Sequence, residues 1–139
     1  MSIIRNDFHF ISNCGAMKGM DYNVFCSLIL GIEPQIRSAF VYRNNGELLA
    51  GGMRQGVKTL LPSEELTKSV QNTLLRWHTR ELLFPFLGKG KYSLTEYEKV
   101  KRITFPLDTH ALLVVGIEVE VKHDGIIDKI LQLIKTEIK

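Results

Sequence analysis

The longest unbroken apolar run of the chain, Ala111–Ile117, constrains its fold more than any other feature. As a strand, this run would present apolar side chains on both faces. It therefore predicts the central strand of a sheet that helices cover on both sides. A helix that spans a bilayer needs about 20 apolar residues. The run is far shorter than that, so we do not expect this chain to be an integral membrane protein.

A β-hairpin is predicted on the N-terminal side of this run. The segments Ile36–Arg43 and Glu47–Met53 have the composition of strands, and Asn45-Gly46 lies between them. Both central residues of a type I′ turn need a positive φ, which Asn and Gly tolerate best. The pair therefore predicts a tight type I′ hairpin. Gly51-Gly52, late in the returning strand, is typical of a bulge or of a close approach to the backbone.

Three helices are predicted where apolar residues recur every three or four positions. Asp21 caps the first helix, and Pro34 forbids its continuation. Ser63 caps the longest helix, which ends at Phe84-Pro85 because the residue before proline avoids the helical region. Asp124 caps the last helix. The longest helix carries an apolar stripe made of Leu66, Val70, Leu74 and Trp77.

Three further strands complete the predicted order: Tyr92–Tyr97, Lys99–Leu107 and Ala111–Val121. The order is therefore helix, strand, strand, helix, strand, strand, strand, helix, and short links make the sheet antiparallel. We expect an α+β fold, a five-stranded antiparallel sheet with helices on both faces. Residues 21–139 would form this single domain, and residues 1–20, which show no sustained period, an irregular N-terminal arm.

The composition is typical of one globular domain that is stable without disulfide bonds. The chain has 139 residues, of which 45% are hydrophobic and 24% charged. Its first 20 residues lack the apolar core of a signal peptide. Cys14 and Cys26 fit neither a disulfide framework nor a C-x-x-C motif. We therefore expect a cytoplasmic protein with reduced thiols.

This order of elements resembles the roadblock/LC7 and profilin-like architecture, with the Asn45-Gly46 hairpin after the first helix and Phe105–Val115 as a late hairpin. Ala50–Arg54 and Glu96–Thr104 are also similar to segments of small, uncharacterised archaeal proteins. The roadblock resemblance implies homodimers or heterodimers that act as scaffolds and regulators of small GTPases. The related PAS and Cache arrangement implies a ligand pocket between sheet and helix. Neither resemblance implies catalytic residues.

The sequence carries no pattern typical of an active site or a metal centre. No pair among the four histidines, His9, His78, His110 and His123, has the spacing that places two ligands on one helix face. Phosphate-binding loops, dinucleotide fingerprints and nucleophile elbows are also missing from the sequence. We therefore expect a non-enzymatic protein with no catalytic residue, no metal and no cofactor.

The positive charge is concentrated in one region. The chain has a net charge of +3, and residues 76–102 alone hold seven basic and three acidic residues. This excess is too small for a general nucleic-acid binder, but it suits an anion or an acidic partner. Glu81, Glu96 or Glu98 could instead supply the counter-charge, within the fold or across a dimer. The candidate anion-binding residues are Arg54, Arg76, Arg80 and Arg102.

Two functional hypotheses follow from these patterns. The first is a regulatory or scaffold module that forms a homodimer through the long helix and the strand Tyr92–Tyr97, and binds a protein partner such as a small GTPase. An exposed edge strand invites such sheet extension. The alternative is a PAS-like or Cache-like sensor of a small anionic ligand. The candidate interface residues are Trp77, Arg80, Tyr92, Leu94 and Tyr97.

Overall fold

The computed structural model describes residues 21–138, and the predicted N-terminal arm, residues 1–20, lies outside the described residues. It confirms the predicted α+β fold with its antiparallel sheet, and it adds one short helix, α4. The elements are, in order, α2 (Tyr22–Leu30), β1 (Ile36–Arg43), β2 (Leu48–Met53), α3 (Ser63–Glu81), α4 (Phe84–Leu87), β3 (Ser93–Glu96), β4 (Val100–Pro106), β5 (Ala111–Glu118) and α5 (Asp124–Glu137).

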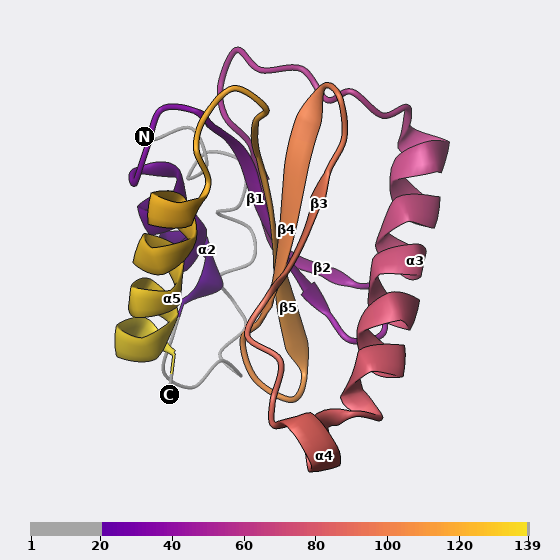
Figure 1. The fold of residues 1–139 in the computed structure, drawn as a ribbon. Helices are drawn as coiled ribbons and strands as arrows, with labels where there is room; N and C mark the ends of the chain where they lie inside the picture. Colours follow the sequence, from indigo (N-terminus) through magenta and orange to yellow (C-terminus); the bar gives the residue numbers. More distant parts are fainter. Residues whose placement is uncertain (1–20, 139) are drawn as a thin grey trace.

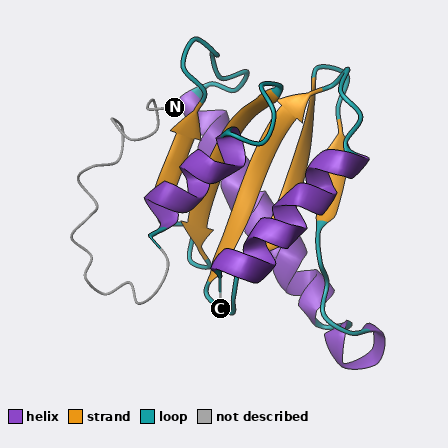
Figure 2. Ribbon diagram, turned by 90° about the vertical axis from the view of Figure 1, so that its left-hand side faces the viewer, coloured by secondary structure: helices purple, strands orange, loops and turns teal. Residues whose placement is uncertain are grey.

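The five strands form one antiparallel sheet in the order β2-β1-β5-β4-β3. The apolar strand β5 is central, as its sequence predicts. Helices α2 and α5 lie side by side on one face of the sheet, and α3 lies on the other (Figures 1 and 2). Strands β2 and β3 are the two edges of the sheet, and α4 leads from α3 into β3.

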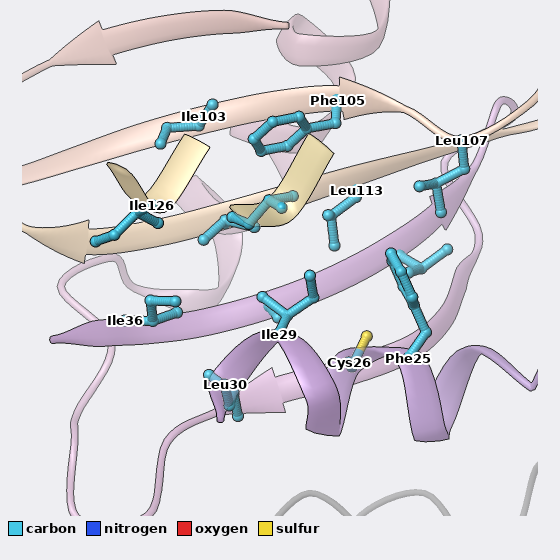
Figure 3. Close-up of a cluster of buried hydrophobic side chains, with 14 of the residues drawn as sticks. Phe25, Cys26, Ile29, Leu30, Ile36, Ile103, Phe105, Leu107, Leu113 and Ile126 are labelled. Carbon is cyan, nitrogen blue, oxygen red and sulfur yellow. The ribbon is translucent and has the colours of Figure 1, made fainter. Parts of the chain in front are cut away.

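The main core lies between the sheet and the helices α2 and α5 (Figure 3). Alternate residues of each central strand point into it, such as Ile103 and Phe105 of β4, and both are fully buried. Phe25 and Ile29 of α2 and Ile130 of α5 are also fully buried. Each such side chain contributes about 1.5–3 kcal/mol to folding. This side of the sheet therefore holds most of the fold's apolar packing.

A smaller cluster lies between the sheet and α3. Val70, Leu74 and Trp77 of α3 are buried there, in agreement with the predicted stripe. The ring of Phe84 packs edge-on against Trp77, with 6.2 Å between ring centroids. Leu66, the first residue of the predicted stripe, is only partly buried. The N-terminal half of α3 is therefore packed less closely against the sheet than its C-terminal half.

The turn of the first hairpin differs from the predicted type I′. Gly46 has a φ of 96°, but no other kind of residue in the described range has a positive φ, so Asn45 does not adopt one. The Gly46 N–H donates to Arg43 O at 2.9 Å, and the Arg43 N–H donates to Glu47 O at 2.8 Å. This is the longer hairpin in which a left-handed glycine follows a type I turn.

Of the three helix caps predicted from the sequence, the structure confirms only the first. Asp21 caps α2 as predicted, since its carboxylate accepts a first-turn N–H at 2.8 Å. Ser63 and Asp124 are wrong as caps, because each is the first helical residue and neither helix has a side-chain cap. The long helix ends at Glu81, before Pro85, which instead lies in the first turn of α4. Proline suits that position because no helical N–H is needed there.

The described part of the chain has no helix that is both long and apolar enough to cross a bilayer.

Candidate functional site

Three of the four candidate anion-binding arginines come together between α3 and the edge of the sheet. Arg76 and Arg80 project from successive turns of α3, and Arg102 projects from β4 opposite Thr95 of β3. Together they line a small hollow of about 20 Å³, room for roughly one water molecule. We call this hollow the arginine pocket. Its other lining residues are Thr73, Trp77, Ser93, Thr95, Tyr97 and Thr104.

No carboxylate of the described residues forms an ion pair with the arginines of this pocket. Glu81 instead contacts His78, with 3.2 Å between Oε1 and Nδ1, and neither Glu96 nor Glu98 forms an ion pair in residues 21–138. The predicted counter-charge from within the fold is therefore wrong. Arg76 and Arg80 are exposed, so their guanidinium groups are accessible to an anion from outside the chain.

Arg102 is the most enclosed cation of the pocket. Its Nη1 donates a hydrogen bond to the Ser69 hydroxyl. Burial lowers the pKa of Arg102 from its usual value, and the neighbouring charge of Arg76 acts in the same direction. A carboxylate or phosphate oxygen at this position would restore the lost solvation, and a guanidinium binds such oxygens through paired N–H groups.

Arg54 lies apart from the arginine pocket and has a different role. Its guanidinium donates to the main-chain oxygens of Ile36 at 2.7 Å, Glu33 at 3.0 Å and Leu30. These carbonyls lie at the end of α2 and in the segment that leads into β1. Helix ends leave such carbonyls without partners. Arg54 therefore joins the end of α2 to the sheet, and its donors are used within the fold.

The candidate interface residues separate into two groups. Arg80 is exposed, and Tyr92 and Tyr97 are 45% and 48% exposed. Trp77 is only 3% exposed and belongs to the cluster under α3, so it offers no surface to a partner. The Leu94 side chain packs against the main core. Leu94 is partly buried, so it would contribute to an interface mainly through its main chain.

The main chain of β3 presents unused hydrogen-bonding groups at the edge of the sheet. The Tyr97 N–H donates to Val100 O at 2.8 Å, so it points toward β4. Because the direction alternates along an antiparallel strand, the groups of Thr95 and Ser93 also point toward β4. The N–H and C=O groups of Leu94 and Glu96 therefore point away from the sheet.

An exposed apolar surface precedes β3 in the chain, at residues that were not named from the sequence. It comprises the end of α3, its link to α4, and α4 itself, where Phe86 is 82% exposed and Leu87 78%. In the sequence, Phe84-Pro85 predicts only the end of a helix. The signal was the density of large apolar residues around it. We call the exposed residues of this region the α3–α4 surface: Leu75, Leu82, Leu83, Phe86 and Leu87.

The described residues offer little for metal binding or covalent catalysis. Within residues 21–138, no group of three His, Cys, Asp or Glu side chains is placed to hold a metal ion. Cys26 is fully buried in the main core. Burial raises the pKa of its thiol well above the usual value, so the thiol stays protonated and unreactive.

The fold is similar to solved structures of roadblock/LC7 proteins. The gliding protein MglB of Thermus thermophilus superposes with a TM-score of 0.65 at 15% identity, over 81% of this chain and 82% of that chain. A roadblock/LC7 domain of Streptomyces avermitilis gives 0.63 at 11% identity, over 86% and 94%. MglB of Myxococcus xanthus gives 0.62 at 14% identity, over 82% and 88%. At these identities the likeness confirms the predicted roadblock/LC7 fold.

Comparison of the sequence with protein-family models identifies the family of this chain. Among curated protein sequences, none matches this chain. A family model described as "Family of unknown function (DUF6659)" matches residues 16–138. Since that match spans most of the sequence, the chain belongs to the DUF6659 family.

Proposed function

We propose that this protein is a non-enzymatic scaffold or regulatory module, and that it forms a homodimer through β3, α3 and α4. The observation that carries the proposal is the β3 edge. Unused main-chain groups and the arginine pocket lie at this edge, and α4, which carries the exposed Phe86 and Leu87, leads into β3. An unpaired strand edge and exposed large apolar side chains are aggregation hazards on a protein that stays alone. A second copy would pair with the strand edge, cover Phe86 and Leu87, and bring a carboxylate toward the arginines.

The edge strand β3 suits pairing with a second copy of itself. Two β3 strands in antiparallel pairing would join the two sheets across a two-fold axis, as isologous interfaces require. The other edge, β2, is less suitable. Its pairing with β1 shifts register between Val41 and Tyr42, which interrupts the regular row of donors and acceptors.

The α3–α4 surface provides the apolar area that such a contact needs. Phe86 and Leu87 extend this surface toward the start of β3. Burying it would contribute about 25 cal/mol for each Å² of apolar surface removed from water.

The arginine pocket gives the interface a charge that a second copy can match. Ser93 and Thr95 of β3 line the pocket, so a strand added beside β3 would run past it. Glu96 and Glu98 lie at the end of β3 and form no ion pair in the described chain. Glu96 shares a face of β3 with Leu94, opposite the arginine pocket, so we assign the counter-charge of Arg80 to Glu98 of the second copy.

A protein partner completes the proposed function. The resemblance to roadblock/LC7 proteins, which act as scaffolds and regulators of small GTPases, makes a small GTPase the partner to test first. A cytoplasmic location agrees with this proposal. The relation to archaeal proteins stays a prediction.

Proline at the β3 edge tests the proposed dimer. Glu96→Pro removes an outward N–H but leaves the hydrogen bonds between β3 and β4 in place. We expect it to weaken the dimer at least about 10-fold in light scattering across a dilution series. Leu94→Pro removes the other outward N–H, together with core packing of the leucine.

The matched control is Glu96→Ala, which removes the carboxylate but keeps the N–H. It should weaken the dimer far less than Glu96→Pro. Equal masses for Glu96→Pro and the unmodified protein at every concentration would refute pairing through β3. The alternative hypothesis, a sensor of a small anionic ligand, depends on the inner face of α3 and not on this edge, so it stays a separate prediction.

A further inference from the structure

A cavity of about 240 Å³ lies between the sheet and the N-terminal half of α3, beside the arginine pocket. Phe40, Val114 and Gly116 line it from the sheet, and Leu66 lines it from α3. The loop between β2 and α3 lines one side of it with Leu61 and its neighbours, and the cavity is partly open to solvent. An apolar cavity of about 150 Å³ already holds benzene. This cavity therefore has room for a small organic molecule.

The cavity exists because two small residues face each other on the sheet. Ser38 of β1 and Gly116 of β5 are register partners, and a Cβ atom added at Gly116 would lie 2.8 Å from Ser38 Oγ. Larger residues at these positions would project into the space beneath α3. The hollow is therefore specified by the sequence of the two central strands.

One uncompensated cation lines this apolar cavity. Arg37 also lines it, but its Nη1 lies 3.2 Å from Glu118 Oε2, and its Nη2 donates to Lys58 O at 2.9 Å. Arg102 lines the cavity as well as the arginine pocket, and among residues 21–138 no carboxylate pairs with it. An anion in the cavity would therefore meet the free charge of Arg102.

The polar groups of the cavity fit a carboxylate. A guanidinium presents two parallel N–H groups, which match the two oxygens of a carboxylate. Tyr42 also belongs to the lining, and burial raises the pKa of its hydroxyl to about 12, so it remains a donor at neutral pH. The rest of the lining is mainly apolar. It would hold a hydrocarbon body and would not solvate a second charge.

We propose that this cavity binds a small monocarboxylate with an apolar aliphatic or aromatic body, whose carboxylate pairs with Arg102. The volume is below the range of about 300–1,000 Å³ for drug-sized ligands, so the ligand has about ten non-hydrogen atoms. Ligand binding here is independent of the proposed dimer, since the cavity lies within one chain.

The test uses octanoate as the probe, with 1-octanol and octylammonium as neutral and cationic counterparts. Titration calorimetry should show saturable binding of octanoate, with octanol at least about 10-fold weaker and octylammonium weaker still. In amide NMR spectra, octanoate should shift Ser38, Val114 and Gly116. Shifts confined to Leu82–Leu87 would instead mark adsorption to the exposed α3–α4 surface and would overturn the proposal.

Two variants and one control locate the carboxylate. Arg102→Met removes the charge but keeps the aliphatic stem, and should weaken octanoate binding about 10- to 100-fold. Lys68→Met removes an exposed charge of α3 that lines neither the cavity nor the arginine pocket, and should change the affinity less than about 3-fold. Ser38→Leu fills the cavity and should abolish binding, even if Arg102→Met fails to fold. Undiminished binding to Ser38→Leu, equal affinity for octanol, or no binding of octanoate would each overturn the proposal.

Discussion

Glu81 Oε1 lies 3.2 Å from Nδ1 of His78, one turn back on α3, and not beside either arginine of that helix. This placement explains why the arginine pocket keeps its charge. Arg76 and Arg80 are four residues apart, and like charges at that spacing repel by a few tenths of a kcal/mol. Within the described chain this repulsion is not offset by an ion pair. It occurs at the position where the proposed second copy would bring a carboxylate.

Reversal of charge at Arg80 should weaken the dimer. Arg80→Glu replaces an attraction to Glu98 of the second copy with a repulsion, and we expect about 10-fold weaker association by sedimentation velocity. The double variant Arg80→Glu with Glu98→Arg should recover most of the loss. Lys122→Glu makes the same change in net charge in the loop before α5 and should have little effect. A loss as large for Lys122→Glu would contradict a specific pair.

Alanine at Gly51 should strongly destabilise the fold. A Cβ atom there would lie 2.1 Å from Ala39 O, and Gly51 has a φ of 110°. We expect Gly51→Ala to lower the free energy of unfolding by about 3 kcal/mol or more in urea titrations. Gly56 also has a positive φ, 83°, but nothing lies within 4 Å of its added Cβ atom. Gly56→Ala should therefore lose only about 1–2 kcal/mol, and equal losses would contradict the close approach.

Removal of the Arg54 guanidinium should destabilise the fold without affecting anion binding. Arg54→Met leaves three main-chain oxygens without their charged donor, which should cost about 2–4 kcal/mol in urea titrations. The control is Arg43→Met, which removes an exposed ion pair with Glu47 and should cost less than about 1 kcal/mol. Similar losses for the two variants would show that Arg54 does not anchor the end of α2.

Stability should fall in alkaline solution. Burial raises the pKa of Tyr42 to about 12, against about 10 in the unfolded chain. The folded protein therefore holds a proton that the unfolded chain releases, so this stability is complete below pH 10 and is lost between pH 10 and 12. The loss should approach about 3 kcal/mol. Thermal unfolding of Tyr42→Phe should show a smaller decline over this range, and an identical decline would contradict the assignment.

The order of elements could be predicted because each one has its own local signal. The alternation along β4 places Ile103 and Phe105 in the core, and the double-sided apolar run predicts the central position of β5. Turn and cap details were harder. The hairpin turn uses Gly46 but not Asn45 as its left-handed residue, because one additional residue in the loop changes the turn type.

The site could be predicted only in part. The spacing of Arg76 and Arg80 on one helix face is local, and the structure brings Arg102 to them through the pairing of β3 and β4. Arg54 has the same chemistry, but its partners lie in α2 and β1, which no local pattern indicates. The cavity depends on the register between Ser38 and Gly116, residues far apart in the sequence.

Sedimentation equilibrium of the unmodified protein at about 100 µM tests the central proposal most directly. The predicted result is the mass of two chains, with a return to the mass of one chain on dilution or on introduction of Glu96→Pro. A mass of one chain, 15.9 kDa, at every concentration up to that limit would contradict a homodimer built on the β3 edge.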